Sequence, residues 1–173
     1  EFDSALTRAE GYERNGNRVE AIASLRGAVS LYRGDLLESC YDEWITAPRD
    51  DLRRRFVSAL ERLAALLTER AEYAAAIPYV ERLLALDPLR EDAYRQLMRL
   101  HDARGDRGLA VQVYQACVGA LDQELGLEPS HATRETYEAL LHGHDPPERA
   151  GPGRPAHDGD MPSAPPLVGR VAE

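Results

Sequence analysis

Apolar residues recur at α-helical spacing through most of the first 142 positions of the chain. Steps of four or three residues place one set on a single helical stripe: Leu52, Phe56, Leu60, Leu63 and Leu67. The segments 77–84 and 110–121 show the same spacing, and no run alternates between apolar and polar residues as a strand would. The pattern therefore predicts an all-α protein.

Clusters of turn-forming residues separate the predicted helices. They are Asn15-Gly16-Asn17, Asp87-Pro88, Arg104-Gly105-Asp106 and the segment 126–130. Amphipathic helices joined by connections this short pack as antiparallel pairs.

Small and large apolar positions also repeat, with an offset of 34 residues. Ala76 and Val80 correspond at this offset to Ala110 and Tyr114, and 34 residues is the period of tetratricopeptide repeats. Ala21 occupies the same place in an earlier copy, but 55 residues before Ala76, so 21 additional residues separate the first two copies. The sequence thus predicts a tetratricopeptide-like stack of about three antiparallel helix pairs, with an insertion and a C-terminal closing helix.

An ordinary helical bundle with chance periodicity is the alternative fold. The two folds differ at the repeated alanines, because the helices of each repeat approach closely where these small side chains lie. The repeat therefore requires Ala76 and Ala110 to be buried on helices that pair as equivalents.

The insertion, residues 36–48, and the segment that follows it carry two local features. Trp44 and Leu37 are expected to pack the insertion onto the repeats, and Asp50 is expected to cap the next helix. The run 53–55 consists of three arginines, which aspartates one turn earlier can pair in solvent.

The closing helix follows Ser130, which is expected to cap it. Its apolar residues Tyr137, Leu140 and Leu141 would then cover the last helix pair.

The chain is acidic, with 21 basic against 30 acidic residues, and every basic residue is arginine. Nucleic-acid affinity depends on neutralising phosphates, so a net charge of −9 argues against direct binding of nucleic acid. No apolar run reaches the ~18 residues of a membrane span. Cys40 and Cys117 form no CxxC motif and are expected to be buried apolar residues in a reducing cytoplasm.

Composition changes abruptly after Leu141, where a stretch rich in proline and glycine begins. Such a composition is typical of a flexible linker. We therefore divide the chain into a helical domain over residues 1–142, a linker over 143–165 and the start of a further domain over 166–173. Because it begins at Glu1 without a methionine, the chain is expected to be a piece of a longer protein.

Three motifs stand in order along the helical domain. The first is Leu31-Tyr32-Arg33-Gly34-Asp35-Leu36-Leu37 with Asp42, Trp44 and Arg49; the second is Asp87-Pro88-Leu89-Arg90-Glu91 with Tyr94, Arg95, Leu97 and Met98; the third is Glu124-Leu125-Gly126-Leu127-Glu128-Pro129-Ser130 with Tyr114, Thr133 and Tyr137. Their order and spacing over roughly residues 2–142 resemble the bacterial transcriptional activator domain of SARP antibiotic regulatory proteins and larger multidomain regulators.

The resemblance also implies neighbouring domains. Family members usually carry a winged-helix DNA-binding domain before this module, and larger members carry an ATPase domain after it. Residues 166–173 resemble the Leu-Val-Gly-Arg-x-x-Glu segment that opens such ATPase domains. The chain contains no GxxxxGK[ST] phosphate loop, so neither ATP nor another cofactor is expected to bind here.

The predicted function is that of a protein-interaction and regulatory module. Stacked helix pairs form a concave surface lined by the first helix of each pair. Candidate protein-binding residues on it are Arg62, Glu69, Arg95, Arg99 and Asp102. The resemblance implies a second copy in a homodimer, RNA polymerase or flanking domains as partners, within the cytoplasm and away from membranes. A general tetratricopeptide adaptor unrelated to transcription is the alternative.

The sequence does not favour an enzyme or a metal protein. Catalysis requires convergent polar groups in a cleft, and the chain has no nucleophile elbow. His101 falls where tetratricopeptide repeats pack a side chain between helices, so it is expected to be a hydrogen-bonded structural residue. The run 142–145, His-Gly-His-Asp, lacks the further ligands that a metal site needs. We expect no catalytic, cofactor-binding or metal-binding residues.

Overall fold

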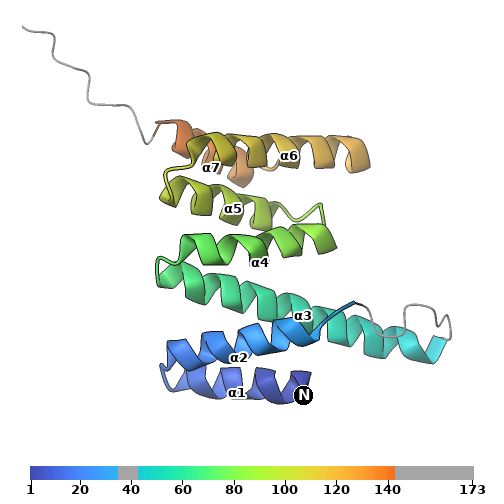
Figure 1. Ribbon diagram of the computed structural model, residues 1–173. Helices are drawn as coiled ribbons and strands as arrows, with labels where there is room; N and C mark the ends of the chain where they lie inside the picture. The colour runs from blue at the N-terminus through green and yellow to red at the C-terminus, as the bar shows by residue number, and fades with distance from the viewer. Residues whose placement is uncertain (35–42, 143–173) are drawn as a thin grey trace, which may run out of the picture.

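Seven helices make up the part of the chain that the computed structural model describes, residues 1–34 and 43–142, and no strand occurs there (Figure 1). The helices are α1 (Phe2–Arg14), α2 (Arg18–Leu31), α3 (Glu43–Glu69), α4 (Tyr73–Leu86), α5 (Glu91–Ala103), α6 (Arg107–Leu125) and α7 (His131–His142). Every predicted turn cluster lies between two of them. None of these helices has both the length and the apolar character needed to cross a bilayer.

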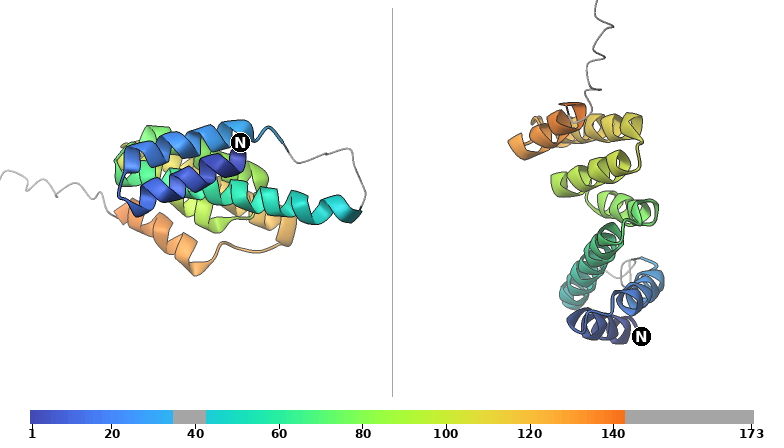
Figure 2. Two further views of the ribbon diagram at one scale, coloured as in Figure 1. Left: turned by 90° about the horizontal axis from the view of Figure 1, so that it is seen from below. Right: turned by 90° about the vertical axis from the view of Figure 1, so that its left-hand side faces the viewer.

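The first six helices form three antiparallel pairs stacked in chain order. Helix α1 packs on α2, α3 on α4 and α5 on α6, while α2–α3 and α4–α5 contacts join successive pairs. Figure 2 shows α1, α3 and α5 along one side of the stack and α2, α4 and α6 along the other. The predicted all-α stack of helix pairs is confirmed.

Small residues lie where the two helices of each pair meet. The three alanines aligned by the repeat, Ala21, Ala76 and Ala110, are at most 1% exposed and lie on the second helices α2, α4 and α6. Ala9 and Ala64 on the facing first helices are fully buried. The helices that carry these alanines pair as equivalents, so the structure favours the repeat over a chance bundle.

The apolar interior runs through the stack. One cluster of buried residues extends from α1 to α5 and includes Leu25, Phe56 and Val80. A smaller cluster of Tyr94, Cys117 and Leu121 continues between α5 and α6. Half-buried apolar side chains of α4 and α6 pack against both clusters, so the interior continues to the last pair.

An aromatic stack joins the first pair to the second. Tyr32, directly after α2, stacks on Phe56 of α3, with ring centroids 3.8 Å apart and planes within 8°. The guanidinium of Arg82 lies over the other ring, 4.6 Å from the Phe56 centroid, and donates a 2.9 Å hydrogen bond to the Tyr32 carbonyl. These contacts fix the end of α2 before the chain enters the insertion.

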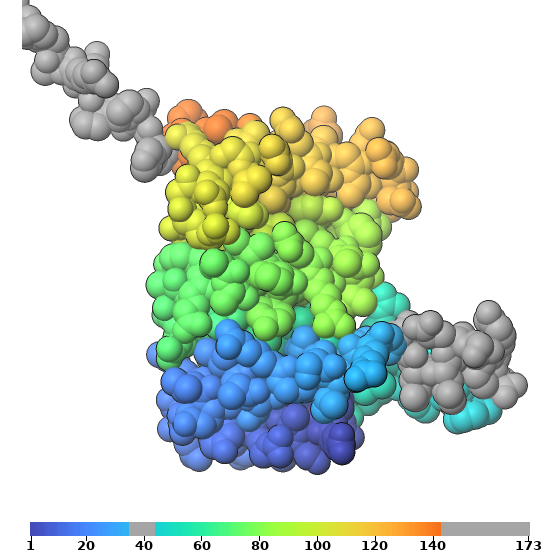
Figure 3. All heavy atoms as spheres, viewed as in Figure 1, coloured from blue at the N-terminus to red at the C-terminus, as the bar shows by residue number. Residues whose placement is uncertain are grey.

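The first helix of the second pair begins inside the insertion and is therefore longer than the sequence predicts. Helix α3 begins at Glu43, which makes Pro48 an interior residue of the helix and Asp50 a residue of its third turn. The prediction that Asp50 caps this helix is therefore wrong. In Figure 3 the first turns of α3 lie at the edge of the molecule, outside the block of stacked pairs.

Trp44, expected to pack the insertion onto the repeats, is not buried. Trp44 is 65% exposed, whereas Ile45 beside it is 2% exposed. Ile45 lies seven residues before Leu52, so it continues the buried stripe of α3, while Trp44 is rotated about 100° away. Leu37 and Cys40 lie outside the described residues.

The closing helix α7 packs on α5 and α6, as predicted, and of the residues expected there Tyr137 takes part while Leu141 does not. It buries Thr133 and Thr136, and Tyr137 stacks on Tyr114 with centroids 4.0 Å apart. Leu141, expected to cover the last pair, is 40% exposed. Helix α7 is thus held by hydroxyl groups and one aromatic stack more than by its leucines.

Replacing Ala76 with leucine tests the close approach of paired helices. The added atoms have no space at a fully buried crossing, so Ala76→Leu should lower the free energy of unfolding by about 1–3 kcal/mol. Urea denaturation followed by circular dichroism measures this. Ala74→Leu, on the exposed side of the same helix, is the matched control and should change stability by about 0.5 kcal/mol or less. Equal effects would contradict the packing described.

Candidate protein-binding groove

A groove lies between the first helices of the second and third pairs. It encloses about 480 Å³. Helix α3 contributes Ala65, Thr68 and Glu69, and helix α5 contributes Asp92, Arg95, Gln96, Arg99 and Leu100. Apolar groups are thus combined with charged side chains along its walls.

The structure brings three of the five candidate binding residues together. Glu69, Arg95 and Arg99 all line this groove. Arg62 is directed instead towards α1, and Asp102, near the end of α5, is exposed outside the groove lining. Three of the five candidates therefore line the groove, and the other two lie outside it.

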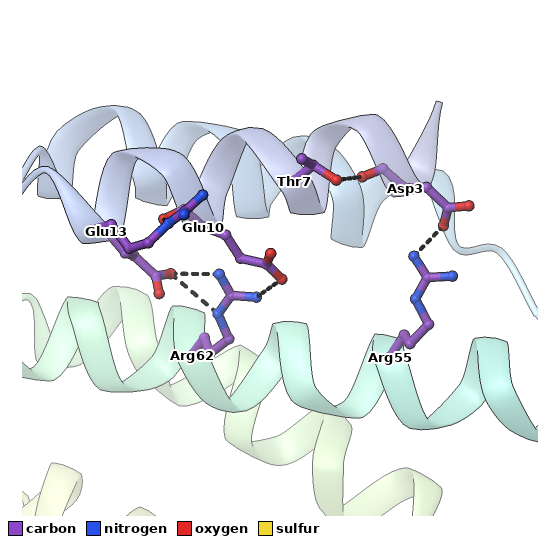
Figure 4. A network of polar contacts seen from close by, with 7 residues as sticks. Asp3, Thr7, Glu10, Glu13, Arg55 and Arg62 are labelled. Carbon is purple, nitrogen blue, oxygen red and sulfur yellow. Dashed lines mark hydrogen bonds and ion pairs between the residues drawn. The ribbon is translucent and has the colours of Figure 1, made fainter.

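Arg62 forms an internal ion-pair network between α1 and α3. Its guanidinium donates to Glu13 at 3.0 and 3.2 Å and to Glu10 at 3.5 Å, and Arg55 pairs with Asp3 at 2.6 Å further along the same helices (Figure 4). The Arg62 side chain is only 25% exposed. Its contacts attach the first pair to the long helix α3.

The acidic residues of the groove are paired within the protein. Glu69 forms an ion pair of 3.1 Å with Arg18 of α2. Asp92 accepts a 2.8 Å hydrogen bond from Arg90, which also bridges to Glu61 of α3 at 2.6 Å. The negative charges of the groove are therefore partly neutralised.

Threonine hydroxyls of α7 hold the two groove arginines. Arg95 donates to Thr133 Oγ1 at 2.9 Å, and Arg99 donates to Thr136 Oγ1 at 3.5 Å. Sequence reasoning missed both threonines because it assigned the packing of α7 to its apolar residues. Their i, i+3 spacing on a predicted helix was the available signal.

Glu91 anchors the start of α7 to the start of α5. One of its carboxylate oxygens accepts hydrogen bonds from the Ser130 amide at 2.8 Å and from the Ser130 hydroxyl at 2.7 Å. Burial acts to raise the pKa of Glu91, but hydrogen bonds from Thr133 and Ser130 and the charge of Arg95 outweigh it. Its pKa therefore lies below the ordinary value. Ser130 directly precedes α7. Its carbonyl accepts the amides of Thr133 and Arg134, and its hydroxyl also contacts the Thr133 hydroxyl at 3.2 Å.

Other candidate chemical groups give no reactive site. His101 is buried as expected, and its Nδ1 atom has no hydrogen-bond partner within the described residues, so the predicted hydrogen bonding is not found at that atom. Burial raises the pKa of the Cys117 thiol to about 11, so the thiol stays protonated at neutral pH. The described residues contain no group of ligands that could hold a metal, and the run 143–145 lies outside them.

The family comparison identifies the domain. The family described as "Bacterial transcriptional activator domain" matches residues 1–141. The chain belongs to this family. Membership places it among transcriptional regulators and favours a regulatory role in transcription over a general adaptor.

Two curated relatives are named as transcriptional regulators. The "Transcriptional regulatory protein MoaR1" of Mycobacterium tuberculosis (strain ATCC 25618 / H37Rv) is 32% identical over 118 residues, and that of Mycobacterium bovis (strain BCG / Pasteur 1173P2) is 31% identical. Each match covers 61% of this chain and 38% of the relative, so the chain corresponds to less than half of either regulator.

A solved structure shows the same fold. "Mycobacterium tuberculosis EmbR in complex with low affinity phosphopeptide" matches with a TM-score of 0.67 and 22% identity, over 83% of this chain and 38% of that one. At this identity the similarity establishes the helical architecture alone.

Replacing Glu91 with glutamine should loosen α7. Glu91→Gln removes the charge of the acceptor for Ser130, so the free energy of unfolding should fall by about 1 kcal/mol near pH 7. Because the folded pKa lies below the ordinary 4.5, this contribution is present above that value and is lost as pH falls through the folded pKa. Urea denaturation should therefore separate the two proteins near neutral pH and bring them together in acid, below the folded pKa of Glu91.

Glu138→Gln is the matched control, since Glu138 is an exposed residue of α7 itself. It should leave stability nearly unchanged at both pH values. A difference between wild type and Glu91→Gln that persists or grows in acid would contradict the role assigned to the Glu91 carboxylate.

Replacing Arg62 with alanine tests the ion-pair network of Figure 4. Arg62→Ala should lower the free energy of unfolding by about 1 kcal/mol, because Arg62 is half-buried and contacts two carboxylates. Arg54→Ala is the control, as its single pair with Asp51 is 75% and 55% exposed and should contribute little. Thermal unfolding of both variants measures this. Equal shifts of the unfolding temperature would contradict the structural role assigned to Arg62.

Proposed function

We propose that this domain is the protein-interaction module of a bacterial transcriptional regulator, and that its groove between α3 and α5 binds a segment of a partner protein. The partner is a second copy of the regulator, RNA polymerase or a flanking domain of the same regulator. On this proposal the domain acts in the cytoplasm, binds no nucleic acid itself and contributes no catalytic step.

One observation carries the proposal: Glu69, Arg95 and Arg99 line a single groove that no helix of the described chain fills. Its walls come from two successive repeats, so a bound segment would contact both pairs at once. The acidic balance of the chain, with 30 acidic against 21 basic residues, supports a protein partner over a nucleic acid, because a nucleic acid requires many phosphates to be neutralised along its backbone.

A bulky residue in the groove tests the proposal. Ala65 is exposed and lines the groove, so Ala65→Trp should obstruct it without disturbing the core. In a regulator carrying this domain, the variant should lower transcription from a reporter promoter at least about tenfold, the loss expected when a buried contact is blocked. Ala74→Trp, on α4 at the other side of the stack, is the control and should keep wild-type output. Equal output from both variants would contradict the proposal.

Two binding measurements then assign the role. Sedimentation equilibrium of the 173-residue chain detects self-association, and fluorescence anisotropy with purified mycobacterial RNA polymerase detects contact with the enzyme. The interaction that Ala65→Trp abolishes and Ala74→Trp preserves is the one made by the groove. If both interactions are absent while the reporter still responds to Ala65→Trp, the partner is a flanking domain.

A further inference from the structure

Two arginines of the groove differ from the arginines that join neighbouring helices through ion pairs. Arg62, Arg90 and Arg55 each form ion pairs with carboxylates of neighbouring helices. Arg95 and Arg99, in contrast, donate only to threonine hydroxyls, and neither forms an ion pair within the described residues. A guanidinium has five N–H donors, so most of the donors on both side chains are available to a ligand.

The unpaired charge of the groove is therefore positive. Its own carboxylates, Glu69 and Asp92, are already paired with Arg18 and Arg90. Glu91 lies close enough to Arg95 for the arginine charge to lower its pKa, but its carboxylate accepts hydrogen bonds from the amide and the hydroxyl of Ser130. Arg99 is the less compensated of the two, since no described carboxylate pairs with it.

The spacing of the two guanidinium groups defines what they fit. Arg95 and Arg99 lie one turn apart on α5, about 6 Å along the helix axis. Thr133 and Thr136 hold them from α7, and the apolar side chains of Ala65 and Leu100 lie beside them. Two carboxylates about 6 Å apart, as on successive turns of a helix or on alternate residues of an extended strand, match this arrangement.

We propose that the groove binds an acidic peptide segment of the partner protein, with one Asp or Glu side chain on Arg95 and a second on Arg99. Guanidinium groups bind carboxylates through two parallel hydrogen bonds, and a site partly shielded from water strengthens such contacts. The net charge of −9 does not prevent this, because distant charges are screened beyond about 8–10 Å at physiological salt. This inference rests on the proposed function, since it names the chemistry of the partner at the same groove.

Selection from a random library of peptides of about 12 residues, displayed on phage, tests the inference with the full 173-residue chain as bait. Peptides whose binding is lost with Ala65→Trp as bait are the groove ligands. We expect these peptides to be enriched in Asp and Glu over the unselected library, with two acidic residues at the spacing given above.

A labelled peptide of the selected consensus is then titrated with purified variants. Arg99→Gln should weaken binding about tenfold, and Arg95→Gln with Arg99→Gln about a hundredfold. Arg54→Gln removes the same charge outside the groove and should change the affinity by less than about twofold. The doubly lysine-substituted protein, Arg95→Lys with Arg99→Lys, keeps the charge but loses the paired hydrogen bonds, so its affinity should lie between wild type and the glutamine variants.

Other results would contradict one or both proposals. Arg99→Gln is the decisive single variant, because its loss of one 3.5 Å hydrogen bond leaves α7 attached through Glu91 and Arg95. Groove ligands without acidic enrichment, or acidic ligands insensitive to Arg99→Gln, would overturn the inference and leave the proposed function standing. An RNA oligonucleotide that binds through the same two arginines would overturn the choice of a peptide. If Ala65→Trp affects no selected peptide, both proposals fail.

Discussion

Close approach of paired helices at small side chains is the constraint on which the stack depends. A single amphipathic helix pair exposes apolar surface on both of its sides, and only stacking buries it. The alanines at 21, 76 and 110 allow each pair to close, which in turn places the larger residues of both helices at one continuous interior. The 34-residue step therefore reflects a steric requirement, and the apolar stripe alone would not have distinguished the repeat from a general bundle.

The insertion after the first pair interrupts this regularity, and specific contacts compensate for it. A chain that leaves the stack between α2 and α3 must return in the correct register. Tyr32 fixes the point of departure by stacking on Phe56, and Arg82 holds both from α4. Ion pairs from Arg55 and Arg62 to α1 fix the return. The first pair is thereby attached to α3 by charged and aromatic contacts as well as by its apolar face.

Periodicity could predict the helices and their pairing, because burial of an apolar stripe is a property of each segment and its nearest neighbours. Periodicity could not predict whether an apolar residue near the end of a helix is buried or exposed. Trp44 was expected to pack the insertion onto the repeats, yet the register set by Leu52 and Phe56 places Ile45 on the buried side. Candidate binding residues posed a similar difficulty. Position on a first helix selected all five candidates, but it could not show which of them share a groove or that Arg62 contacts α1. Side-chain partners from distant segments decide such cases.

The closing helix connects the stability of the stack to the groove. Its buried contacts are largely hydroxyl groups, and these same groups hold Arg95 and Arg99. Polar contacts of this kind contribute about 0.5–1.5 kcal/mol each, which is less than the burial of large apolar side chains. Helix α7 is therefore expected to open at a lower free energy than the paired helices, and opening would release both arginines from their positions. A ligand that binds the held arginines must in turn stabilise the closed helix, because binding to one of two states shifts the equilibrium towards it.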